Sequence, residues 1–144
     1  MSTSDDLDAF VRFFERLSPA TLDRLEAIYA PDACFRDPFN EVRGVPAIRR
    51  IFEHMYRQVD EPAFHVSARF LNPDEAMLVW LFSFRFKGSR QIQQLEGTTR
   101  LRFDERGRVT LHRDYWDPAQ GVYEKLPAIG SVARWLRARL SAGR

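Results

Sequence analysis

Hydrophobic residues in the N-terminal part of the chain recur at the spacing of amphipathic helices. This spacing predicts helices over residues 5–17, 20–30 and 45–59. Ser4 or Asp5 is expected to cap the first helix, and Pro31 is expected to end the second, because proline does not continue a helix. A short extended segment, residues 33–40, separates the second helix from the third.

From residue 62 onward, apolar residues fall at every second position, which is typical of half-buried β-strands. The pattern predicts four strands, over residues 63–71, 75–88, 89–107 and 108–117. The runs KGSR and DERGR are polar, glycine-containing connections of the hairpin type, so neighbouring strands should be antiparallel. We therefore predict one α+β domain over residues 1–144, with helices on one face of a curved antiparallel sheet and a helical extension over about 119–142.

Composition and charge narrow the classes of function. Hydrophobic residues make up 44% of the chain, which is enough for a sizeable core, and no run approaches the roughly 18–20 apolar residues of a membrane span. The acidic start MSTSDDLDAF is unlike a signal or transit peptide, so we expect a cytoplasmic protein. The 22 basic residues, all arginine except Lys87 and Lys125, are spread along the chain without a basic stripe. We expect no nucleic-acid partner.

Reactive side chains gather in the last predicted strand, in the run LHRDYWDP at residues 111–118. Because alternate side chains of a strand share a face, His112, Asp114 and Trp116 point to one side of the sheet. An imidazole and a carboxylate on an inward face are costly unless they are paired. This face therefore holds either a satisfied structural pair or a functional site.

The order of elements and three sequence runs resemble the nuclear transport factor 2-like superfamily, which includes ketosteroid isomerases and SnoaL-like polyketide cyclases. The runs are LDRLEAIYAPDACFRDP, the helix G-x-x-A-I-x-x-x-F at residues 44–52, and RFDERGRV. The resemblance covers about residues 7–118. It implies a cystatin-like α+β barrel, in which the sheet curls around a conical apolar cavity roofed by the helices.

Comparison with the isomerases suggests roles for individual residues. Asp37 in the run FRDP stands where those enzymes keep their general-base aspartate. Their oxyanion-binding groups correspond to Phe13 and Thr99, and a supporting tyrosine corresponds to Phe52. Phenylalanine has no hydrogen to donate, and one oxyanion donor is commonly worth about 3 kcal/mol to catalysis. Steroid isomerisation by the known arrangement is therefore not expected.

The resemblance also implies that the face with positions 112, 114 and 116 looks into the cavity. The predicted catalytic set is Asp37, His112 and Asp114. The predicted binding residues are Phe13, Tyr29, Phe52, Trp80, Phe82, Phe84, Thr99 and Trp116. Two other interpretations stay open: Asp37 before Pro38 is also an ordinary turn residue, and the aromatic residues are also ordinary core residues.

Assembly is predicted from the opposite face of the sheet. Arg113, Tyr115 and Asp117 lie there with Arg100 and Arg102, and a mixed arginine and aromatic surface suits a homodimer interface. A solvated outer face is the alternative. The amphipathic run SVARWLRARL is predicted to be a packed helix, and the alternatives are a lid, a dimer element or a membrane-surface helix.

The function we predict is a small-molecule enzyme that uses an aspartate base in an apolar cavity on a ring-bearing or lipid-like substrate. No cofactor is implied, because the chain has no glycine-rich phosphate loop or dinucleotide fingerprint. No metal site is predicted, because His54, His65 and His112 lack metal-ligand spacing. The alternatives are a non-catalytic binder of an apolar small molecule and a dimerisation or adaptor module.

Overall fold

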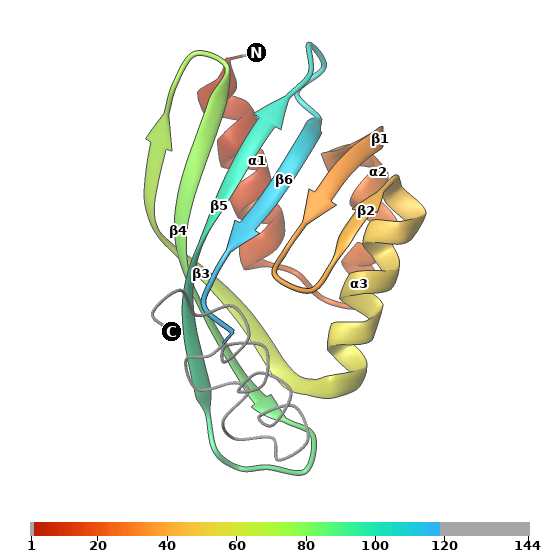
Figure 1. Ribbon diagram of the computed structural model, residues 1–144, viewed down its shortest axis with the longest axis vertical. Helices are drawn as coiled ribbons and strands as arrows, with labels where there is room; N and C mark the ends of the chain where they lie inside the picture. Colours follow the sequence, from red (N-terminus) through yellow and green to blue (C-terminus); the bar gives the residue numbers. More distant parts are fainter. Residues whose placement is uncertain (1, 119–144) are drawn as a thin grey trace, which may run out of the picture.

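The computed structural model describes residues 2–118. Its helices are α1 (Thr3–Glu15), the 3-10 helix η1 (Ala20–Arg24), α2 (Leu25–Ile28) and α3 (Val45–Gln58). Its strands are β1 (Tyr29–Arg36), β2 (Glu41–Arg43), β3 (Val59–Leu71), β4 (Glu75–Phe86), β5 (Gln93–Phe103) and β6 (Val109–Tyr115) (Figure 1). The predicted C-terminal helices, with their proposed lid, dimer and membrane-surface roles, lie outside the described residues. Within residues 2–118, no helix is both long enough and apolar enough to cross a membrane.

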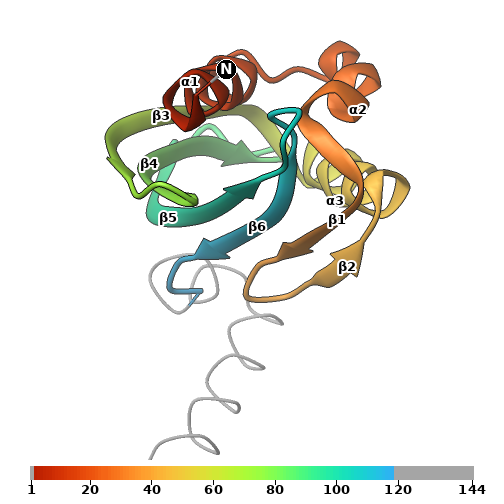
Figure 2. The same ribbon diagram turned by 90° about the horizontal axis from the view of Figure 1, so that it is seen from above.

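The strands form one six-stranded sheet in the order β2-β1-β6-β5-β4-β3. Figure 2 shows the sheet curving from β3 round to β1 and β2 without closing into a barrel. The predicted α+β class with a curved sheet is confirmed. The sheet is not antiparallel throughout, however, because β1 runs parallel to β6. The extended segment predicted near residues 33–40 is in fact the strand β1 and the start of its hairpin with β2.

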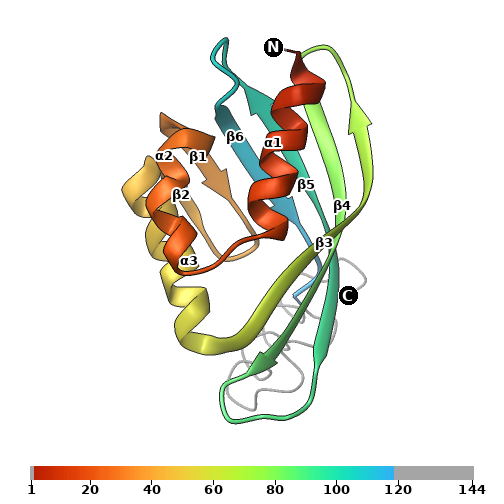
Figure 3. The same ribbon diagram turned by 180° about the vertical axis from the view of Figure 1, so that it is seen from behind.

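Two helices cover the concave side of the sheet. The helix α1 crosses β3 and β4, and α3 packs against β1, β2 and the start of β3 (Figure 3). The buried face of α1 carries Leu7, Phe10, Val11 and Phe14, at the spacing that the sequence predicted. Burial of this face against the sheet builds the core between the two layers.

The helix boundaries differ from the predictions at two points. Ser2 caps α1 rather than Ser4 or Asp5, because its side chain accepts the Asp5 backbone N–H while the Asp5 carboxylate accepts the Ser2 backbone N–H. The second helix is half 3-10 and ends at Ile28, before Pro31. Tyr29 already has extended backbone angles and is fully buried as the first residue of β1.

The outer face of the sheet carries the arginines that the sequence placed there. Arg100 and Arg113 lie directly opposite each other on β5 and β6, which is unfavourable for like charges. Glu75 on β4 offsets this repulsion through ion pairs to Arg100 and Arg102 at 2.8 and 3.3 Å. The Arg113 guanidinium lies 4.6 Å from the ring centre of Tyr115. The homodimer through this face stays a prediction.

Candidate functional site

Strand register brings the polar residues of the concave face together. Thr99 on β5 lies opposite Asp114 on β6. On its other side, Thr99 lies opposite Leu78 on β4, and Trp80 follows Leu78 by two residues on the same face of that strand. His112 is two residues before Asp114, so its side chain points to the same face. The inward orientation that the sequence analysis expected for His112 and Asp114 is the one found, because both line a pocket between the sheet and the helices.

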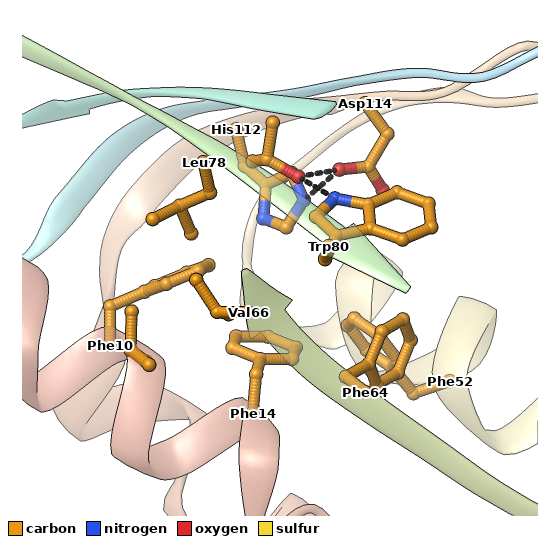
Figure 4. Close-up of a pocket in the computed structure, with 11 residues that line it drawn as sticks. Phe10, Phe14, Phe52, Phe64, Val66, Leu78, Trp80, His112 and Asp114 are labelled. Atoms are coloured by element: carbon orange, nitrogen blue, oxygen red, sulfur yellow. Dashed lines mark hydrogen bonds and ion pairs between the residues drawn. The ribbon is translucent and has the colours of Figure 1, made fainter. Parts of the chain in front are cut away.

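Four hydrogen bonds join Tyr29, His112, Asp114, Thr99 and Trp80 in one chain. Figure 4 draws the bonds between the members of this chain that line the pocket. The Tyr29 hydroxyl lies 2.7 Å from Nδ1 of His112, and Nε2 of His112 lies 2.7 Å from Oδ1 of Asp114. On the other side, Nε1 of Trp80 donates to Oγ1 of Thr99 at 2.7 Å. Oγ1 of Thr99 lies 2.5 Å from the same Asp114 oxygen. Asp114 therefore stands where the two arms of the chain meet.

The direction of each hydrogen bond follows from the donor inventory. The indole N–H of Trp80 can only donate, so Thr99 accepts from it and gives its own hydrogen to Asp114. If the Tyr29 hydroxyl is protonated, it donates to Nδ1 of His112, which leaves the imidazole hydrogen on Nε2, facing Asp114. The Thr99 hydroxyl and the His112 Nε2–H then both donate to Oδ1 of Asp114, as a carboxylate that only accepts hydrogen bonds requires.

The protonation state of Tyr29 follows from its surroundings. The side chain is fully buried. Burial raises the pKa of the Tyr29 phenol well above its ordinary value of 10.0, and the negative charge of Asp114 raises this pKa further. Tyr29 is therefore neutral at physiological pH and acts as a hydrogen-bond donor to His112. The residue pattern predicted Tyr29 as a ligand-binding residue and gave no sign of this role, because the contact with His112 joins two segments far apart in the chain.

A small inner pocket of about 40 Å³ lies beside the polar chain. It is lined by Phe10, Val11, Phe14, Phe52, Phe64, Val66, Leu78, Trp80, Thr99, His112 and Asp114. Figure 4 shows the polar groups of Trp80, His112 and Asp114 on one side and the phenylalanine rings on the other. The space has room for little more than a water molecule or a small substituent.

A larger outer pocket of about 550 Å³ opens next to the inner one. Its walls are α3, the β1–β2 hairpin and the inward face of β3, β4, β5 and β6. Phe52, Phe64, Trp80 and Asp114 line both pockets, so they form the boundary between the two. A volume of this size suits a small organic ligand. Asp114 is the one carboxylate among residues 2–118 that borders both spaces.

The polar environment of Asp114 leaves part of its carboxylate unused. Oδ1 of Asp114 takes the hydrogen bonds from His112 and Thr99, whereas Oδ2 accepts none from residues 2–118. The side chain is 18% exposed, against 5% for His112. Asp114 can therefore present one oxygen to a bound molecule while its other oxygen is held in place.

Asp37, the predicted general base, lies on the wall of the outer pocket in the β1–β2 hairpin. Its Oδ1 accepts the backbone N–H groups of Phe39 and Asn40 at 2.8 and 2.7 Å, and the Asn40 amide bonds both carboxylate oxygens at 3.1 Å. The Asp37 backbone N–H also donates to the Asn40 carbonyl. Asp37 thus organises a tight turn. Within residues 2–118, it forms no hydrogen bond to His112 or to Asp114.

The remaining predicted residues fall into four groups. Phe52 and Trp80 line both pockets, Thr99 lines the inner one, and Phe82, Phe84 and Trp116 line the outer one. Phe13 and Tyr29 line neither pocket. Phe13 packs edge-on against Phe14, which lines the inner pocket together with Phe10 and Val11 of the same helix. The helical spacing of Phe10 and Phe14 was the available signal for that face.

Metal binding finds no support in the described part of the chain. Residues 2–118 contain no group of three or more His, Cys, Asp or Glu side chains placed to hold a metal ion.

Comparison with known proteins assigns the chain to a family. Residues 10–112 match the SnoaL-like domain. The chain belongs to the SnoaL-like domain family. This result confirms the resemblance inferred from the sequence runs. No curated protein matches this SnoaL-like chain in sequence.

Solved structures share the fold of this SnoaL-like protein. A protein proposed to be a SnoaL-like polyketide cyclase from Jannaschia sp. CCS1 is 14% identical, with a TM-score of 0.69 over 79% of this chain and 86% of that one. One proposed to be a polyketide cyclase from Acidithiobacillus ferrooxidans is 20% identical, with a TM-score of 0.69 over 88% and 95%. A protein with a ketosteroid isomerase-like fold from Catenulispora acidiphila DSM 44928, in complex with trimethylamine, is 15% identical, with a TM-score of 0.69 over 79% of this chain and 86% of that one. At these identities the similarity shows the fold alone.

Tyr29→Phe should destabilise the protein by about 1–3 kcal/mol at pH 7, because Nδ1 of the buried His112 loses its partner. The raised pKa of Tyr29 means that the wild type gains stability from this phenol below pH 10 and loses it as the pH rises further. The difference in free energy of unfolding between the wild type and Tyr29→Phe should therefore become smaller above pH 10. Urea unfolding at pH 7 and at pH 10–11 measures both effects.

Tyr115→Phe is the matched control, because Tyr115 lies on the outer face and the change keeps the ring beneath Arg113. We expect Tyr115→Phe to leave the free energy of unfolding within about 0.5 kcal/mol of the wild-type value. A Tyr29→Phe protein as stable as the wild type at pH 7 would show that the hydroxyl does not anchor His112.

Proposed function

We propose that this SnoaL-like protein is a small-molecule enzyme in which Asp114 is the general base. The observation that supports this proposal most is that His112 and Thr99 both hydrogen-bond the same oxygen of Asp114, at the boundary of the two pockets. Such an arrangement fixes the carboxylate and leaves Oδ2 for the substrate. Bases that are held in a defined position in an apolar space are typical of proton-transfer enzymes.

The proposed step is removal of a proton from a carbon next to a carbonyl group. Oδ2 of Asp114 takes the proton, the electron pair of the C–H bond forms a C=C double bond, and the pi electrons of the carbonyl move to its oxygen to give an enolate. The protonated Asp114 then returns the proton to the same or another carbon. In the ring-closing alternative, the enolate carbon attacks a second carbonyl carbon, and the alkoxide that forms takes the proton from Asp114. His112 and Thr99 act as positioning residues through Oδ1. This sequence needs no cofactor, and it covers both isomerase and cyclase chemistry.

The substrate class follows from the walls of the outer pocket. On its sheet side, the rings of Phe64, Phe82 and Phe84 are stacked in a row, with centres 4.5 and 4.9 Å apart and planes inclined by 20° and 23°. A row of nearly parallel rings offers a flat apolar surface. It supports a ring-bearing or lipid-like substrate whose reactive carbon lies beside Asp114.

Steroid isomerisation by the known arrangement remains unexpected for this pocket. The Thr99 hydroxyl, which stands in place of an oxyanion donor, already gives its hydrogen to Asp114. Phe52 borders the pocket without any polar hydrogen. Together these side chains provide a held base, and they do not provide the paired donors that stabilise a steroid enolate.

The second candidate is a non-catalytic binder of an apolar molecule. It is favoured by the fact that Tyr29, Trp80, Thr99 and His112 all satisfy one another, so the polar chain needs no substrate to be stable. The two candidates share the outer pocket and differ in whether Asp114 accepts a proton.

A minimal ring ketone separates the two candidates. 2-Tetralone carries acidic hydrogens next to its carbonyl, and it is small enough for the outer pocket. In deuterated buffer, an enzyme with a working base should speed the loss of these proton signals in the NMR spectrum, with a rate that saturates as ketone concentration rises. Saturable binding without faster exchange would support the binder and would contradict the enzyme.

A further inference from the structure

A row of polar side chains follows the pocket-facing edge of α3. Arg50, His54 and Arg57 all line the outer pocket, and all three are exposed, so they stand at its rim. Their spacing of four and three residues puts them on adjoining turns of one helix face. We name these three residues the rim row. Ala47 and Met55 on the same helix continue the apolar wall.

The rim row has no charge partner in the described chain. Neither Arg50 nor Arg57 forms an ion pair with any residue from 2 to 118. Arg49, the immediate neighbour of Arg50, behaves differently: it pairs with Asp23 at 2.9 Å and lies 3.7 Å from Glu53 on the same helix. Arg49 does not line the pocket. The helix therefore separates a paired arginine on its outer side from unpaired arginines at the pocket.

The two carboxylates of the outer pocket do not engage the rim row. Asp37 is occupied by three N–H groups of its own hairpin turn. Asp114 is occupied by the His112 and Thr99 donors at the far boundary of the pocket. Both acids thus have local donors, whereas the guanidinium N–H groups of the rim row have none from the described protein. These unused donors are available to a ligand.

We propose that the rim row binds an anionic oxygen group, a carboxylate or a phosphate, on a ligand whose ring lies against the stacked phenylalanines. This inference rests on the proposed function in taking the outer pocket as the substrate site. Guanidinium groups bind carboxylates and phosphates through paired N–H donors, which gives orientation as well as affinity. An acidic group held at the rim would direct the opposite, apolar end of the substrate toward Asp114.

Three naphthalene probes with one shared ring system test the proposal: 2-naphthoate, 2-naphthyl phosphate and the neutral 2-naphthamide. Their affinities for the full chain can be measured by calorimetry at low and high salt. We expect at least one anion to bind about 10-fold more tightly than the amide at low salt, because charge-assisted hydrogen bonds are stronger than neutral ones. The tighter anion identifies the preferred group. The preference should shrink as salt screens these exposed charges.

Variants assign the preference to the rim row. The double variant Arg50→Gln with Arg57→Gln should bind the anions and the amide about equally, with amide affinity unchanged. Arg49→Gln, which makes the same charge change on the same helix away from the pocket, should keep the wild-type preference. Equal affinity of the wild type for the anions and the amide overturns the proposal. A preference for anions that survives in the double variant also overturns it, and so does a failure of all three probes to bind.

Failure of this inference is distinguishable from failure of the proposed function. Asp114→Asn leaves the rim row intact, so it should retain the preference for anions whatever the role of Asp114 in proton transfer. A preference for anions without catalysed ketone exchange would support anion binding by the rim row and contradict the proposed enzyme. Catalysed ketone exchange without a preference for anions would support the enzyme and contradict anion binding by the rim row.

Discussion

Asp114→Asn should slow deuterium exchange into 2-tetralone by about 100-fold, because the variant has no basic oxygen to take the proton. The amide oxygen of asparagine can occupy the place of Oδ1 and still accept from His112 and Thr99. The pocket should therefore keep its shape, and the affinity for the ketone should stay within a few-fold of the wild type. Exchange rates by NMR and the ketone affinity, measured on the same samples, check both expectations.

Asp37→Asn is the matched control, since it makes the same chemical change on the other wall of the outer pocket. The asparagine oxygen can still accept the backbone N–H groups of Phe39 and Asn40, so the hairpin turn should survive. We expect the exchange rate to change by less than about 3-fold, well below the contribution of a general base. The opposite result, with Asp37→Asn inactive and Asp114→Asn active, would place the base at Asp37, where the isomerase resemblance puts it.

Gly97→Ala should destabilise the protein by about 1–3 kcal/mol, the usual cost of overfilling a packed core. Gly97 on β5 lies opposite Trp80 on β4, and the indole ring covers the glycine. A methyl group here would come within 2.9 Å of Cζ3 of Trp80 and closer still to Cη2 and Cζ2. The indole would have to move, and its hydrogen bond to Thr99 would break. Urea unfolding measures the loss, and ketone exchange should fall with it because Thr99 no longer holds Asp114 as firmly.

A double-mutant cycle shows whether the clash with the indole is the cause. Trp80→Phe shortens the side chain over Gly97 and leaves room for the methyl group. Gly97→Ala should therefore cost less in the Trp80→Phe background than in the wild type, with a coupling of about 0.5–3 kcal/mol, as expected for residues in contact. Additive costs would show that the glycine is needed for a reason other than the indole, such as the flexibility of β5.

The hydrophobic pattern alone predicted most of the architecture. The buried face of α1 and the alternating positions of β3 to β6 match the residue spacing, although β3 begins at Val59, four residues before its predicted start. Amphipathic periodicity reflects directly which side of an element faces the core. The same alternation correctly put His112 and Asp114 on one face. Its failures came in short elements: α2 ends early, and β2 has only three residues, which is too few for a periodic signal.

Parallel pairing could not be predicted from local sequence. β1 runs beside β6, although Val109 follows its partner Tyr29 by 80 positions along the chain. Such pairing depends on how the whole sheet curls and on where α2 delivers the chain. The consequence for function is direct, because this pairing brings the Tyr29 hydroxyl to His112.

The sequence by itself determined which residues could do chemistry here and on which face of the last strand they lie, since side-chain alternation is a local property of a strand. The tertiary structure alone decided their relations. Strand register set Thr99 against Asp114, burial fixed the proton on Tyr29, and the hairpin turn engaged Asp37. These relations depend on distances between segments far apart in the chain, and hydrogen bonds are lost within about an ångström, so residue spacing cannot specify them.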